Sequence, residues 1–124
     1  MTWTVVLTPE FEQWFDKQEA GLQDRINMMI TLLEISGPNP GRPHVDTLVG
    51  SRYPNMKELR IQYAGEPWRV GFAFNHRQQA VLLYGGQKTG KKRFYTLLIA
   101  QVDAIFARDL ARKKENLLRH FRKN

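Results

Sequence analysis

The 124-residue sequence contains no cysteine, which excludes a disulfide framework, a zinc site with cysteine ligands and a cysteine nucleophile. It also lacks any apolar run that approaches the roughly 18 residues of a membrane-spanning helix. The first eight residues have neither the basic start nor the long apolar stretch of a secretory signal peptide. These absences predict a cytoplasmic protein with no membrane association.

Histidine is scarce as well. The three histidines, His44, His76 and His120, are scattered, and their spacing fits no metal-ligand pattern. The sequence therefore predicts no metal site and no cofactor.

The composition predicts one folded domain with an uneven distribution of charge. Hydrophobic residues make up 42% of the chain and aromatic residues 11%, which is enough for a packed core. The net charge is +7, yet residues 1–83 hold eight basic and nine acidic side chains, whereas residues 84–124 hold eleven and three. One-sided positive charge favours a nucleic-acid or acidic partner. A solvated basic tail would leave the same pattern.

The hydrophobic periodicity predicts an α+β fold with the order β-α-α-β-β-β-α. Short links between the last three strands imply antiparallel hairpins, and the helices are expected on one side of an antiparallel sheet. The segment 36–54 is rich in proline and glycine and is expected to be a loop. The expected elements are a strand at about 2–8, helices at about 9–18 and 20–35, strands at about 56–63, 67–75 and 80–87, and a helix from about 96.

Cations gather on one face of the predicted sheet. Alternation along the strands places Arg60 and Arg69 on the same solvent face, where arginine forks can bind phosphate oxygens. The alternative is an ordinary exposed face on which Glu58 pairs with Arg60 or Arg69. Further cations follow at the end of the last strand, at Lys88, Lys91, Lys92 and Arg93.

Three further features allow two interpretations each. The segment from Gly85 to Lys92 is close to a P-loop, but Lys92 stands where magnesium binding requires serine or threonine, so we reject nucleotide hydrolysis. His44, near Asp46, could act as a general base or be an ordinary loop residue. Tyr95 could stack on an unpaired base or simply pack at the start of a helix.

Four segments of the chain resemble the RelE/ParE toxin superfamily, and within it the phage-related HigB-like toxins of bacterial type II toxin–antitoxin systems. The resemblance lies in Gly41–Leu48, Met56–Ile61, Gly65–Phe74 and Leu82–Thr89. It implies a RelE-like fold for residues 1–110, with residues 111–124 as a basic C-terminal helical extension or tail.

The resemblance also implies an activity, namely that of a metal-independent, ribosome-dependent mRNA endonuclease in which the RNA 2′-hydroxyl attacks the adjacent phosphate. By the same resemblance, Arg60 and Arg69 would bind phosphate, Lys88 would protonate the leaving group, and His44 or Asp46 would accept the proton. The residues expected to bind RNA are Lys57, Lys91, Lys92, Arg93 and Tyr95.

The resemblance implies three partners: the ribosome, mRNA and a neutralising helix-turn-helix antitoxin of the HigA type. Two alternatives remain open. Glu58 stands where RelE-type enzymes carry a basic residue, which leaves room for a ParE-like inhibitor of DNA gyrase. The third possibility is a non-catalytic basic module that binds nucleic acid.

Overall fold

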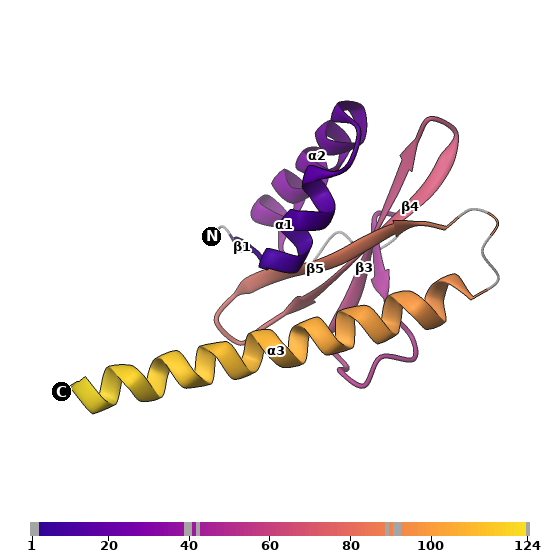
Figure 1. Cartoon of the computed structure of the whole chain (residues 1–124). Coiled ribbons are helices and arrows are strands. Elements are labelled where there is room, and N and C mark those ends of the chain that lie inside the picture. Colours follow the sequence, from indigo (N-terminus) through magenta and orange to yellow (C-terminus); the bar gives the residue numbers. More distant parts are fainter. Residues whose placement is uncertain (1–2, 39–40, 42, 89, 91–92, 124) are drawn as a thin grey trace.

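The computed structural model describes residues 3–38, 41, 43–88, 90 and 93–123. It has the predicted α+β fold and element order, with one additional short strand (Figure 1). The elements are β1 (Thr4–Leu7), α1 (Pro9–Asp16), α2 (Ala20–Ser36), β2 (Val45–Thr47), β3 (Met56–Tyr63), β4 (Glu66–Phe74), β5 (Gln79–Gln87) and α3 (Phe94–Lys123).

Two parts of the expected loop at 36–54 are regular structure, so that prediction is wrong there. Ser36 is the last residue of α2, and β2 pairs antiparallel with β3, with Val45 opposite Leu59. Val45 is buried, which explains why three residues between prolines and glycines still form a strand.

The five strands form one sheet in the order β1-β5-β4-β3-β2. The hairpins β3–β4 and β4–β5 are antiparallel, as predicted, but β1 lies parallel to β5 and pairs Thr4 with Gln79. The sheet is therefore mostly rather than wholly antiparallel.

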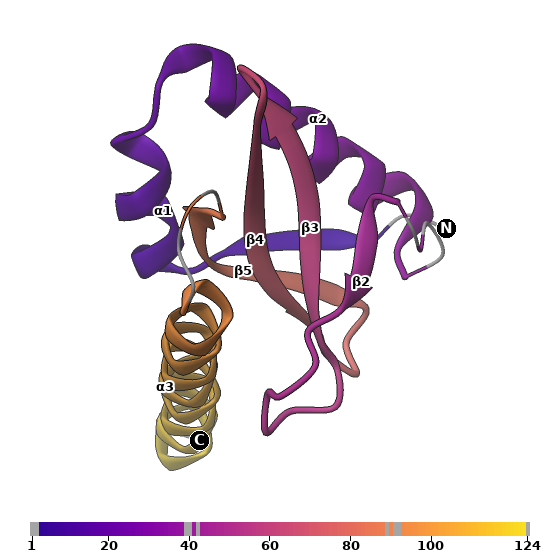
Figure 2. The same cartoon turned by 90° about the vertical axis from the view of Figure 1, so that its right-hand side faces the viewer.

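Helices cover both faces of the sheet, which corrects the prediction that they lie on one side. Helices α1 and α2 pack on one face, and α3 crosses the other (Figures 1 and 2). The first core joins Phe11 and Ile26 to Leu59 and Phe72. The second joins α3 to Met56, Ala73, Val81 and Leu83. On the face that carries Arg60 and Arg69, the side chain of Arg69 is therefore buried, whereas that of Arg60 is 33% exposed.

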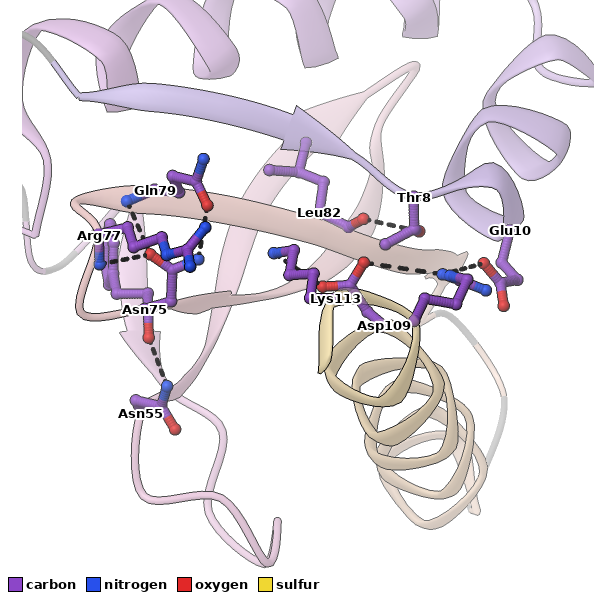
Figure 3. Close-up of polar contacts among 11 residues, drawn as sticks. Thr8, Glu10, Asn55, Asn75, Arg77, Gln79, Leu82, Asp109 and Lys113 are labelled. Carbon is purple, nitrogen blue, oxygen red and sulfur yellow. Dashed lines mark hydrogen bonds and ion pairs between the residues drawn. The ribbon is translucent and has the colours of Figure 1, made fainter. Parts of the chain in front are cut away.

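A buried threonine ties the start of α1 to the sheet. The Thr8 hydroxyl donates a hydrogen bond to the Leu82 carbonyl (2.9 Å) (Figure 3). It also accepts one from the Phe11 N–H (3.2 Å). Thr8 is thus the helix cap, and Pro9 occupies the first helical position, as the sequence predicts.

Helix α3 is held close to α1 and then projects past the sheet. Glu10 of α1 pairs with Arg108 (3.1 Å) and Arg112 (3.5 Å) of α3. Within α3, Asp109 pairs with Lys113 (3.0 Å) (Figure 3). Beyond these pairs the helix continues unbroken (Figure 1). Its apolar side chains Leu117, Leu118 and Phe121 are exposed. None of the described helices is both long and apolar enough to cross a membrane.

Candidate functional site

A buried polar cluster lies between the sheet and the first turn of α3. It consists of Glu58, Arg69 and Tyr95, which we call the Arg69 cluster. Arg69 Nε donates a hydrogen bond to Tyr95 Oη (3.2 Å), and the Tyr95 hydroxyl donates one to Glu58 Oε1 (3.1 Å). Arg69 Nε lies 3.6 Å from the same carboxylate oxygen, and the side chains of both Arg69 and Glu58 are only 6% exposed.

The strand register explains why these residues meet. Arg69 lies directly opposite Arg60, and Glu58 lies opposite Gly71, so all three charged side chains share the α3 face of the sheet. Tyr95 reaches them because Phe94, beside it, is buried in the second core and fixes the first turn of α3. The prediction that Arg60 and Arg69 share a face is confirmed, but only Arg60 is partly exposed to solvent there, because Arg69 is buried.

Burial governs the ionisation of two members of the cluster. Desolvation raises the pKa of Glu58 above its ordinary value, although the hydrogen bond from Tyr95 and the charge of Arg69 act in the opposite direction. Burial also raises the pKa of Tyr95, and the nearby Glu58 carboxylate adds to that rise. Tyr95 is therefore a neutral hydrogen-bond donor near neutral pH.

The guanidinium of Arg69 is not fully used by these contacts. Its Nη1 donates to the Trp68 carbonyl (3.0 Å), so that bond and the bond to Tyr95 occupy two of five N–H donors. Arg69 also lines a groove at the sheet edge, with a volume of about 710 Å³, together with Arg60 and His44. The structure therefore brings three predicted site residues to one groove.

Arg60 and His44 are joined through the backbone at this edge. The Arg60 N–H donates to the His44 carbonyl (2.8 Å), and the His44 side chain is exposed. Asp46 lies on the neighbouring strand, with its carboxylate 3.9 Å from Arg60 Nη1. Both candidate bases therefore lie within reach of Arg60, but only His44 lines the groove.

Lys88 lies near Tyr95 and is not among the described residues that line the groove. Its N–H donates to the Pro67 carbonyl (2.9 Å), which extends the β4–β5 pairing by one residue. Its ammonium group lies 5.5 Å from the centre of the Tyr95 ring, a cation–π distance. The structure thus connects Lys88 to the Arg69 cluster through the tyrosine.

The predicted RNA-binding residues are distributed differently. Lys57 lies on the opposite face of β3 from Glu58 and Arg60, and its ammonium donates to Thr47 Oγ1 (3.0 Å). Arg93 is exposed just before α3. Lys91 and Lys92 lie outside the described residues.

Two features of the site were not found by sequence reasoning. The first is the hydrogen bonding of Tyr95 to both Arg69 and Glu58, because no local pattern shows where a tyrosine hydroxyl will point. The second is the contribution of α2, which gives Arg25, Met28 and Met29 to the groove. Among the described residues, no group of three or more His, Asp or Glu side chains is placed to hold a metal ion.

The fold is that of the RelE class of proteins. A double mutant of the E. coli toxin RelE in the free state matches with a TM-score of 0.58, over 82% of this chain and 99% of that chain, at 10% identity. A crystal structure of isolated E. coli RelE gives a TM-score of 0.54 over 77% and 94%, at 7% identity. At such low identity the likeness establishes the fold alone.

Within that class, the chain belongs to the family described as phage-derived protein Gp49-like, which matches residues 13–107. One relative is the Mycobacterium tuberculosis protein named "Putative toxin HigB3", 45% identical over 92 residues that cover 73% of this chain and 79% of the relative. Another is "Putative toxin HigB2" of the same organism, 38% identical over 100 residues that cover 79% of this chain and only 50% of that relative. The predicted resemblance to the RelE/ParE superfamily and its HigB-like members is confirmed.

Proposed function

We propose that this protein is the toxin of a toxin–antitoxin system and that it is an endoribonuclease that cuts mRNA on the ribosome. Relatives that carry toxin names and a RelE-like fold support the first part. One observation carries the second part: Arg60, Arg69 and His44, from three separate segments, line a single groove. This combination suits the cleavage of a phosphodiester, because it offers two fixed cations and a group that can take up a proton.

The reaction begins with proton removal from the RNA 2′-hydroxyl. We assign this step to His44, since imidazole accepts protons near neutral pH and this side chain is exposed in the groove. Asp46 is the second candidate, and its proximity to Arg60 favours a supporting role. The 2′-oxygen then forms a bond to the adjacent phosphorus.

Charge on the pentacoordinate phosphate is stabilised by Arg60 and Arg69. The bond from phosphorus to the 5′-oxygen breaks, and Lys88 supplies the proton that this oxygen needs. The products are a 2′,3′-cyclic phosphate and a 5′-hydroxyl, so atoms and protons balance without a metal. Glu58 and Tyr95 hold the guanidinium of Arg69 in one orientation.

The proposed activity requires partners. A toxin of this kind would be neutralised by an antitoxin, which we expect to be a HigA-like helix-turn-helix protein, and its substrate would be mRNA on the ribosome. We expect these encounters in the cytoplasm. The basic C-terminal part of α3 would add attraction to RNA.

The test is to induce the protein alone in bacterial cells and to map the 5′ ends of messages within minutes. We expect new 5′-hydroxyl ends in register with codons. Lys88→Ala should slow cleavage by about 100-fold, because a general acid contributes at least this much. Lys88 is only half-buried, so the variant should keep its fold. The matched control is Lys17→Ala, an exposed lysine at the end of α1, which should leave cleavage unchanged.

Other outcomes would contradict the proposal in different ways. Growth arrest with an SOS response and no new RNA ends would favour the gyrase inhibitor. Neither arrest nor new ends would favour a non-catalytic binding module. Full activity of Lys88→Ala would contradict the role of Lys88 as the proton donor.

A further inference from the structure

The groove at the sheet edge extends well beyond the residues assigned to the reaction. Strand β2 covers β3 only as far as Arg60, whose N–H bonds to the His44 carbonyl. Past that point the groove is lined by Ile61 and Gln62 of β3 and, on its other wall, by residues of α2. The reaction described above uses one end of this groove and leaves the α2 wall without a role.

The α2 wall combines one cation with an apolar surface. Arg25 is exposed, Met28 is 67% exposed, and Met29 is half-buried next to it. The described residues that line the groove include three arginines and a histidine but neither aspartate nor glutamate, although Arg60 lies 3.9 Å from Asp46 and Arg69 lies 3.6 Å from Glu58. Three guanidinium groups against these two carboxylates leave the groove with a positive charge, which is complementary to an anion.

A single strand of RNA has the chemistry that fits such a wall. Its phosphates repeat along the chain and can meet arginines that stand at intervals, and its unpaired bases offer flat, polarisable faces. Methionine thioethers make favourable contacts with aromatic rings and adapt to different ring shapes. An acidic peptide would satisfy the arginines but would leave the apolar surface of Met28 and Met29 without a matching group.

We propose that the α2 wall is a nucleotide subsite, in which Arg25 binds a phosphate next to the one that is cleaved and Met28 and Met29 contact the attached base. The subsite deepens the proposed function, and it rests on that function for the identity of the neighbouring phosphate. It takes bases of any sequence, because the wall offers a surface to the base rather than hydrogen bonds to its edges.

The first test uses methionine as its own probe. Methyl-labelled methionine gives separate resonances for Met28 and Met29 at the wall and for Met56, which is fully buried in the second core. Titration of the full chain with a short single-stranded RNA should shift the resonances of Met28 and Met29 and leave that of Met56 in place. An acidic peptide of glutamates should not reproduce these shifts at equal concentration.

The second test counts the phosphate contact. For single strands, the slope of log K against log salt concentration changes by about 0.7 per phosphate neutralised, so Arg25→Gln should flatten this slope by about 0.7. The matched control is Arg77→Gln in the exposed β4–β5 turn, where the same loss of charge should leave the slope close to that of the wild type (Figure 3).

The outcomes separate the subsite from the proposed reaction. Unmoved Met28 and Met29 resonances at RNA saturation, or an unchanged salt slope in Arg25→Gln, would overturn the subsite even if message cleavage is demonstrated. Equal shifts with the glutamate peptide would overturn it in favour of a protein ligand. If the RNA shifts the wall methionines and Arg25→Gln flattens the slope while no message is cut, the subsite stands and the nuclease fails.

Discussion

The ionisation of Glu58 is linked to folding. Burial raises its pKa above the ordinary 4.5, so the folded protein takes up a proton at this carboxyl more readily than the unfolded chain does. Its contribution to stability is therefore complete below pH 4.5 and is lost as the pH rises through the higher, folded-state value.

Glu58→Gln removes this titration, because glutamine resembles the protonated carboxyl. We compare the free energy of unfolding of the variant with that of the wild type. The difference, variant minus wild type, should increase as the pH rises from acid to neutral, by at most about 1.4 kcal/mol per pH unit. The unpaired charge on Arg69 shifts the absolute values but not this trend. Urea unfolding at several pH values measures it, with Glu12→Gln on the exposed face of α1 as control. A flat or falling difference would contradict the pKa direction.

The pairing of Glu58 with Arg69 shows what sequence can and cannot decide about single residues. Strand alternation correctly puts Arg60 and Arg69 on one face, and it leaves open whether Glu58 pairs with either. It cannot reveal that α3 closes over them, so the 6% exposure of Arg69 comes only from the fold. For the same reason, Arg69→Ala would strand a buried carboxylate, which makes Lys88 the cleaner position for testing activity.

At the scale of elements, the contact between α3 and the sheet depends on the absence of a side chain. A Cβ at Gly71 of β4 would lie 2.5 Å from Val102 Cγ1. Gly71→Ala should therefore destabilise the protein by about 1–3 kcal/mol, because two packed elements must separate. Adding Val102→Ala to the Gly71→Ala variant opens space for the new methyl group. Thermal unfolding of the two single variants and the double variant should therefore show that the double variant loses about 1 kcal/mol less stability than the sum of the single losses. Simple additivity would mean that α3 does not rest on Gly71.

One apolar run in the sequence indicates that helices cover both faces of the sheet, although the alternation along the other strands does not show this. Ala80, Val81, Leu82 and Leu83 are all buried, and a continuous apolar run of this kind is typical of a strand covered on both faces. Strand bounds and hairpins could be predicted because each depends on a local pattern. The three residues of β2 could not, because their only support is the neighbouring β3.

At the scale of the whole molecule, the end of α3 adds charge without adding to the core. Among the described residues, the last ion pair between α3 and another element joins Arg112 to Glu10, and the apolar side chains further along are exposed. Removal of residues 115–124 should therefore change the free energy of unfolding by no more than about 0.5 kcal/mol. Chemical denaturation of the full and shortened chains measures this. A larger loss would place the end of the domain beyond the predicted boundary at residue 110.

The parallel pairing of β1 with β5 affects how the protein folds during its synthesis. Residues 4–7 cannot pair with their partner strand until residues 79–82 have been synthesised. Tyr95 contacts Arg69 only after α3 has packed on the sheet. Contacts so distant in sequence form slowly, and chains made from the N-terminus cannot form them early. The ribosome has therefore synthesised most of the chain before the Arg69 cluster can form.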